Sequence, residues 1–237
     1  MGLRTALASK TKADDCISYP QDRDEVMELR GAVSFPYRPT HRFDGPFVDD
    51  RQRSIFNLPK NGVIIKHDVP GWLRPEDAAK LHELAVFAKG PAFELGTASG
   101  LSATIISEAR GDAEPFDTVD LNSTDGPRRR LAARGLRSIR FHQSDAAAWL
   151  EAQANLVPQY GFAFVDHSHS REHVRAACQR LDRVMASGAF VAFHDYSDPR
   201  NFDGTDGYGV FQGVEEGLSY RFRFYGCFGC MGVYRLM

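Results

Sequence analysis

The sequence is poor in cysteine, carries almost no excess charge and contains no long apolar run. Four cysteines in 237 residues are too few for a disulfide framework. A formal net charge of −2 lacks the basic excess that is typical of nucleic-acid-binding proteins. No apolar run approaches the ~18 residues that a membrane-spanning helix needs, and residues 1–15 lack the apolar segment of a signal peptide. We therefore expect a cytoplasmic protein that binds neither nucleic acid nor membrane.

Cys227 and Cys230 form a lone CxxC pair near the end of the chain. A structural zinc site usually needs a second pair at a fixed spacing, and a thioredoxin-type pair lies near the start of a βαβ unit. We therefore expect this pair to lie at a turn between strands rather than to bind metal.

The first seventy residues differ in composition from the rest. Six prolines interrupt them, and aromatic side chains such as Phe35 and Tyr37 lie between the prolines. Proline disfavours long regular elements, whereas the aromatic content disfavours plain disorder. We predict an irregular arm over residues 1–70, able to lie over an active site, that packs on a main domain formed by residues 71–237.

From Gly71 onward, apolar runs alternate with segments of helical periodicity. Helices are expected over 75–90, 101–110, 127–134, 146–154, 172–185 and 208–218, and strands over 92–95, 116–121, 138–142, 162–166, 189–193, 220–225 and 231–236. Alternation of this kind predicts an α/β fold with a parallel sheet covered on both faces. The last two strands are too close for an intervening helix, so they form an antiparallel hairpin.

The segment from Phe93 to Gly100 contains an acid near a strand end (Glu94), a glycine turn (Gly96) and a second glycine that opens a helix. Such a turn lets a ligand approach the backbone at the carboxyl edge of a sheet. The dinucleotide fingerprint is absent because Ala98 replaces its second glycine. A carboxylate here disfavours pyrophosphate and suits a cationic ligand. The alternative is a tight strand-to-helix turn without a ligand.

Two further acids follow the next two predicted strands. Asp120 ends one of them, where open α/β folds often place the carboxylate that binds ribose hydroxyls. Asp145 follows Ser144 beyond the other, in a position to contact an adenine edge. Either acid could instead be a helix cap. Because such groups converge at one sheet edge, we expect them to line one crevice.

This ordered set, together with Asp166, the His194–Asp195 pair and the terminal hairpin, resembles the class I S-adenosylmethionine-dependent methyltransferases over about residues 71–237. The resemblance implies a Rossmann-like seven-stranded sheet in the order 3-2-1-4-5-7-6. In such a fold Glu94 and Gly96 line the methionine portion of S-adenosylmethionine, Asp120 binds the ribose and Asp145 lies by the adenine. The full implied set of cofactor-binding residues is Glu94, Gly96, Thr97, Ser99, Gly100, Ser102, Asp120, Ser144 and Asp145.

A second constellation joins the segment 166–170 to the His194–Asp195 pair, both directly after apolar strands. It is similar to a methyltransferase subfamily with Asp-Gly-x-His-Ser and His-Asp motifs, which includes macrolide-sugar O-methyltransferases. His167 stands where glycine is usual in that subfamily. The resemblance implies that His169 is the catalytic base.

Asp166, His194 and Asp195 are the expected metal ligands, and Asp166 is also expected to serve catalysis. Magnesium prefers the carboxylate oxygens, whereas histidine nitrogens favour a softer metal such as manganese. A metal would acidify a substrate hydroxyl, and His169 would then take its proton. In the alternative, these histidines are hydrogen-bonded strand caps and no metal binds.

We therefore expect a methyltransferase that moves a methyl group from S-adenosylmethionine to a hydroxyl of a small molecule, such as a sugar or another hydroxylated natural product. A divalent metal, Mg or Mn, would assist. The alternatives are a metal-independent N-methyltransferase, a non-catalytic nucleotide-binding module and a nicotinamide-dependent oxidoreductase, which the missing fingerprint disfavours. Formation of a homo-oligomer is left open.

Overall fold

The structure is a computed structural model that describes residues 69–73, 75–111, 114–155 and 160–237. Nearly all of the arm predicted over residues 1–70 lies outside the described residues. No helix within the described ranges is long and apolar enough to span a membrane.

A seven-stranded sheet forms the centre of the fold, in the order β3-β2-β1-β4-β5-β7-β6. This order confirms the fold predicted from the sequence. The strands are β1 (Ala92–Leu95), β2 (Phe116–Asp120), β3 (Ile139–Gln143), β4 (Tyr160–Val165), β5 (Met185–Phe193), β6 (Phe222–Phe228) and β7 (Met231–Leu236). The first five are parallel to one another, and β7 runs antiparallel to both β5 and β6.

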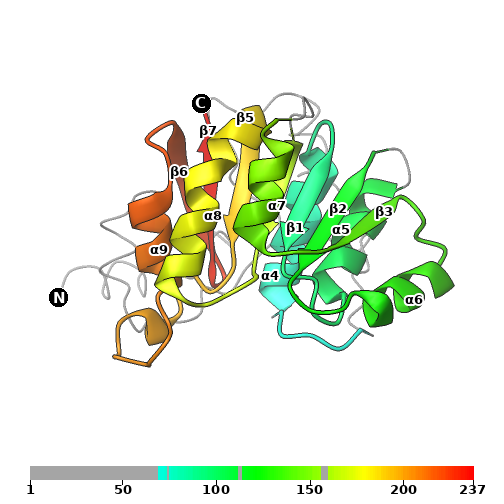
Figure 1. Ribbon diagram of the computed structural model, residues 1–237, viewed down its shortest axis with the longest axis horizontal. Coiled ribbons are helices and arrows are strands. Elements are labelled where there is room, and N and C mark those ends of the chain that lie inside the picture. Colours follow the sequence, from blue (N-terminus) through cyan, green and yellow to red (C-terminus); the bar gives the residue numbers. More distant parts are fainter. Residues whose placement is uncertain (1–68, 74, 112–113, 156–159) are drawn as a thin grey trace, which may run out of the picture.

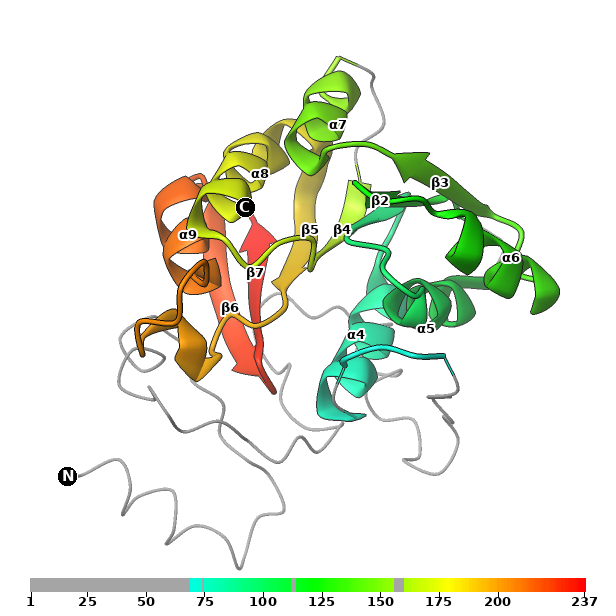
Figure 2. The same ribbon diagram turned by 60° about the horizontal axis from the view of Figure 1, so that its bottom comes forward.

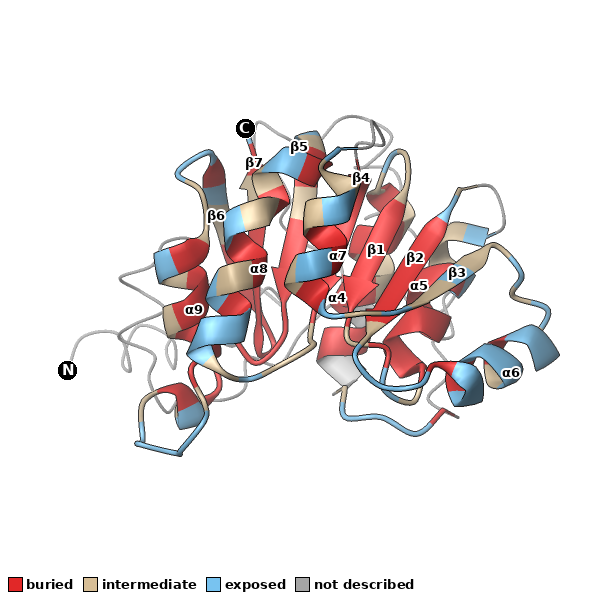
Figure 3. Cartoon of the chain, in the orientation of Figure 1, coloured by how far each residue is buried: buried red, intermediate tan, exposed pale blue. Residues whose placement is uncertain are grey.

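Helices cover both faces of the sheet (Figures 1 and 2). Their bounds are α4 (Pro75–Phe87), α5 (Leu101–Arg110), α6 (Asp125–Ala133), α7 (Ala146–Gln153), α8 (Arg171–Val184) and α9 (Val210–Gly217), with a short 3-10 helix η2 (Pro199–Asn201). One apolar core joins the sheet to α7, α8 and α9, and a second core joins it to α4, α5 and α6. The central strands are therefore buried on both sides, while the outer helix faces are exposed (Figure 3).

Two strand boundaries differ from the prediction by three residues or more. β5 begins at Met185, directly after α8, rather than at Ala189. The additional residues of β5 pair with β4 beyond a register shift between Tyr160 and Phe162. They form an irregular extension that apolar periodicity does not predict. β6 continues to Phe228, which leaves Gly229 and Cys230 as the turn between β6 and β7. Cys227 thus lies in a strand and only Cys230 in the turn.

Strand alternation decides which face each residue beyond a strand can reach. In β5, Phe193 packs in the core under α7–α9, whereas Ala192 packs in the core under α4–α6. The next residue along the alternation, His194, therefore faces the side of α4. Because β7 is antiparallel to β5, the carboxyl ends of the parallel strands lie at the lower edge of the sheet in Figure 1, opposite the labelled C-terminus. The candidate site lies at this edge.

Candidate active site

The turn after β1 is tightly wound. Gly96, Ala98 and Gly100 have φ angles of 102°, 43° and 90°. A Cβ atom at Gly96 would lie 2.1 Å from the carbonyl oxygen of Asp166, at the end of β4. Only glycine fits this approach, since both the φ angle and the neighbouring backbone exclude a side chain. The turn therefore lies directly against the loop that carries the second constellation.

Asp120 holds this turn from the end of β2. Its Oδ2 accepts a hydrogen bond from the Ala98 N–H at 2.9 Å, and its Oδ1 accepts one from the Asn122 N–H at 2.8 Å. Each carboxylate oxygen keeps a further lone pair, and the side chain is partly exposed. The carboxylate is thus fixed in orientation and still able to accept hydrogen bonds from a diol.

Glu94 is fully buried within β1 rather than exposed at the strand end. It is the register partner of Thr118 on β2, whose hydroxyl donates to Glu94 Oε1 at 2.5 Å. Burial raises the pKa of Glu94 to about 8, so the neutral form prevails at pH 7. Its Oε2 has no hydrogen-bond partner within the described part of the chain.

Thr97 and Ser102, both expected at the cofactor, have buried side chains. Thr97 Oγ1 lies 2.6 Å from Thr118 Oγ1, so it continues the hydrogen-bonded chain that ends on Glu94. Ser102 also lies beside Glu94. The side chains of Glu94, Thr97 and Ser102 are thus buried next to the turn, and Thr118 joins Glu94 to Thr97.

The remaining expected cofactor residues surround the turn. The Ser99 carbonyl accepts a hydrogen bond from Arg130. A Cβ atom at Gly100 would lie 3.0 Å from Leu131 Cδ1, so this glycine lets α6 pack closely. Asp145 caps α7 by accepting from the Ala148 N–H at 2.9 Å, and it remains exposed. Asp145 thus caps the helix and also keeps an exposed carboxylate.

Asp166, His169 and Asp195 form a cluster in which one ligand atom from each lies within 4.8 Å of the others. His169 Nε2 is 3.1 Å from Asp195 Oδ2. The hydrogen bond to Asp195 raises the pKa of His169 above its usual value. Burial alone would raise the pKa of Asp195, but the hydrogen bond from His169 and the charge of the nearby His194 outweigh burial and hold that pKa well below its usual range. The structure thus pairs an ionised carboxylate with the imidazole expected to be the base.

Tyr208 and Arg200, which the sequence analysis did not single out, hold the outer side of His169. The Tyr208 ring stacks on the His169 ring with centroids 4.8 Å apart, and the Arg200 guanidinium lies 4.3 Å from the Tyr208 centroid. Both residues come from the segment between β5 and α9, which has no periodic pattern. Asp195 opens this segment with a φ angle of 56°, which is strained for a residue other than glycine.

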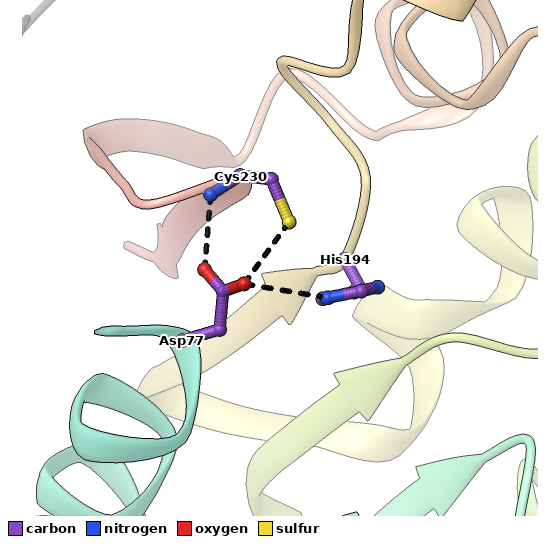
Figure 4. A group of neighbouring side chains, drawn as sticks. All are labelled: Asp77, His194 and Cys230. Carbon is purple, nitrogen blue, oxygen red and sulfur yellow. Dashed lines mark hydrogen bonds and ion pairs between the residues drawn. The ribbon is translucent and has the colours of Figure 1, made fainter. Parts of the chain in front are cut away.

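His194 lies between two groups of side chains. Its Nδ1 is 3.3 Å from Asp166 Oδ1 and 3.5 Å from Asp195 Oδ2, so the three expected metal ligands are adjacent. Its Nε2 points the other way, 3.6 Å from Asp77 Oδ2 on α4 (Figure 4). Burial opposes protonation of the ring, but the carboxylates, Asp166 foremost, raise the pKa of His194 well above its usual value. The sequence places Asp77 only within the helix expected over 75–90.

His167, the residue in place of the usual glycine, is held apart from these acids. Both of its ring nitrogens are buried without a hydrogen-bond partner in the described part of the chain. Burial lowers the pKa of His167 to about 4, so the ring is neutral at pH 7.

Residues 93–196 match a family model described as a methyltransferase domain. The chain is similar to an O-methyltransferase from Bacillus cereus in complex with SAH, with a TM-score of 0.59, 16% identity and 99% of each chain covered. It is also similar to the O-methyltransferase TomG from Streptomyces achromogenes, involved in tomaymycin synthesis and solved with SAM. That match has a TM-score of 0.59 and 16% identity, and covers 90% of this chain and 96% of TomG. No curated protein matches the sequence.

Proposed function

We propose that the chain, whose residues 93–196 match a methyltransferase domain, transfers a methyl group from S-adenosylmethionine to a hydroxyl of a small molecule. The observation that carries the proposal is the His169–Asp195 pair, 3.1 Å apart, at the sheet edge where the β1 turn lies against the end of β4. A base is needed there because a neutral hydroxyl is a poor nucleophile until its proton is removed.

The residues around the β1 turn are suited to S-adenosylmethionine, which supplies a methyl group already activated on a sulfonium. Asp120 presents a fixed carboxylate to the ribose hydroxyls, and Gly96 leaves room for close approach to the backbone. Asp145 provides an exposed carboxylate near the position expected for the adenine. Glu94, Thr97 and Ser102 lie buried beside the turn and hold it in shape.

His169 accepts the proton of the acceptor hydroxyl. Because Nε2 faces Asp195, Nδ1 is the nitrogen left to take this proton. Asp195 then stabilises the resulting imidazolium, and Tyr208 restricts rotation of the ring by stacking on it. Asp195 is in turn held by Asn201, whose side-chain amide donates to the Asp195 carbonyl at 2.8 Å.

The acids beside the base fit a divalent metal such as magnesium or manganese. Asp166 and Asp195 offer oxygen donors, and His194 Nδ1 lies 3.3 Å and 3.5 Å from them, respectively. A metal held there would lower the pKa of a bound hydroxyl and orient it. Without it, His169 and Asp195 would have to activate the hydroxyl alone.

The cofactor assignment is tested by calorimetry on the purified full chain with S-adenosylhomocysteine and, separately, NADH. We expect the first ligand to bind and the second to give no heat. Binding of NADH alone would contradict the assignment and favour an oxidoreductase.

The reaction is tested by following S-adenosylhomocysteine formation over a panel of phenols, glycosides and amines, with wild type and Asp166→Asn. Turnover of hydroxylated compounds that falls sharply in the variant supports metal-assisted O-methylation. Turnover of amines alone, unchanged in Asp166→Asn and in chelator, would support the metal-independent N-methyltransferase instead.

A further inference from the structure

A second cluster of donor atoms lies on the buried side of His194, away from the proposed base. Asp77 from α4, His194 from the end of β5 and Cys230 from the β6–β7 turn each point one ligand atom at the others, within 4.8 Å (Figure 4). Asp195 lies at the margin of this cluster, with its Oδ1 3.7 Å from Cys230 Sγ. His194 therefore presents one nitrogen to the outer acids and the other to this inner cluster.

Two of the three donor separations in this cluster match the edges of a tetrahedron around zinc. Zinc bonds of ~2.0–2.3 Å at tetrahedral angles place neighbouring ligand atoms about 3.3–3.7 Å apart. Cys230 Sγ is 3.3 Å from Asp77 Oδ2, and His194 Nε2 is 3.6 Å from the same oxygen. Both separations fall within this range.

The imidazole aimed into the cluster is buried and lacks a hydrogen bond. The His194 side chain is 6% exposed, and neither ring nitrogen has a hydrogen-bond partner in the described part of the chain. A buried polar group without a partner is costly, and a metal bond to Nε2 would remove that cost at this nitrogen. Nε2 makes no hydrogen bond and only a long ion pair with Asp77, which distinguishes the cluster from a turn that is merely held by Asp77.

The β6–β7 turn is built to admit the Asp77 carboxylate. Gly229 has a φ angle of 62°, and a Cβ atom there would lie 2.0 Å from Asp77 Oδ1. The Cys230 N–H donates to the same oxygen at 2.9 Å. This bond fixes the carboxylate so that its other oxygen, Oδ2, faces both the thiol and His194.

We propose that Asp77, His194 and Cys230 bind a zinc ion. A thiolate, an imidazole and a carboxylate are donors that zinc accepts, and sulfur excludes magnesium as the preferred ion. The ion would have three protein ligands, with one coordination position left to water. It would tie the terminal hairpin to α4 and hold His194 in the orientation that the active site uses. Binding converts the Cys230 thiol to a thiolate and removes the proton from His194 Nε2, and both protons are released to solvent.

The test measures metal content rather than catalysis, so its outcome is independent of the proposed function. The purified full chain is stripped with chelator, dialysed against zinc and then against metal-free buffer, and its zinc is measured by mass spectrometry. The same chain is loaded with cobalt, whose bond to a thiolate gives a charge-transfer absorption. The variants are Cys230→Ala, the matched control Cys227→Ala, which removes a buried thiol from the same hairpin, and Asp166→Asn, which alters only the outer acids.

We expect wild type, Cys227→Ala and Asp166→Asn to retain a single zinc ion per chain and the thiolate absorption. Cys230→Ala should lose the absorption and bind zinc at least ~100-fold more weakly, since even changes outside the ligand shell cost ~10–100-fold. Zinc that survives in Cys230→Ala but is lost in Asp166→Asn would overturn the proposal and place the ion among the outer acids. Absence of zinc or of the thiolate absorption from wild type would also overturn it, whether or not Cys230→Ala folds.

Discussion

Replacing Gly96 by alanine tests whether the close approach of the β1 turn to β4 is a requirement of the fold. The new Cβ would lie 2.1 Å from the Asp166 carbonyl oxygen and 2.8 Å from His167 Cα, and both neighbours are backbone atoms that cannot rotate away. The φ angle of 102° adds a conformational penalty of ~1–2 kcal/mol for an L-residue. Forced overpacking costs a further ~1–3 kcal/mol. The sum is about 2–5 kcal/mol of unfolding free energy.

Gly135→Ala is the matched control. Gly135 has a φ angle of 80°, but a Cβ atom there would meet nothing within 4 Å, so only the conformational penalty of ~1–2 kcal/mol applies. Urea unfolding of both variants without cofactor measures the difference, which we expect to be about 1–3 kcal/mol. Equal losses in the two variants would refute the reasoning, because the steric conflict with β4 would then have no energetic consequence.

Three further predictions concern binding, catalysis and acid stability. Asp120→Ala should weaken S-adenosylhomocysteine binding by ~1–3 kcal/mol in calorimetry, through lost ribose hydrogen bonds, and an unchanged Kd would contradict this. His169→Ala should lower turnover ~10²–10⁴-fold at unchanged cofactor affinity. Because Asp195 raises the pKa of His169, the wild-type rate should rise with pH above the usual histidine value of 6.5, and this limb should vanish in the variant. Asp117→Asn should destabilise the fold by ~1–3 kcal/mol at pH 7. Burial opposes ionisation of Asp117, but hydrogen bonds, that of His142 foremost, lower its pKa. The stabilisation by ionised Asp117 is thus present above 3.8, its pKa in the unfolded chain, and is lost as the pH falls through its lower pKa in the folded protein. Urea unfolding should therefore show the stabilities of wild type and Asp117→Asn converging in acid.

The sequence determines the alternation of helices and strands and the terminal hairpin because these signals are local, whereas the strand order was implied only by the resemblance to methyltransferases. The periods of the apolar residues separate helices from strands, and the short link before Met231 forces an antiparallel hairpin. The start of β5 was missed, since its first residues form an irregular extension that has no periodic signature. Residues 1–68 lie outside the described structure, so the arm stays a prediction.

The same local reasoning brings the expected site residues to one edge, because parallel strands share their carboxyl ends. At this edge the structure adds the specific contacts, a hydrogen bond from the Ala98 N–H to Asp120 and the His169–Asp195 ion pair. What each group can do there depends on its surroundings. Glu94 looks like a strand-end carboxylate in the sequence, yet the pairing of β1 with β2 buries it against Thr118 and raises its pKa to about 8.

Only the tertiary structure decided the environment of His194. The sequence places it next to Asp195, and strand alternation turns it toward α4, but the Asp77 carboxylate that meets its Nε2 comes from a different element. Cys230, 153 residues further along the chain than Asp77, joins the same cluster. No periodicity or motif links residues so far apart. Their contact arises because β7 inserts antiparallel between β5 and β6 and carries the β6–β7 turn to the start of α4.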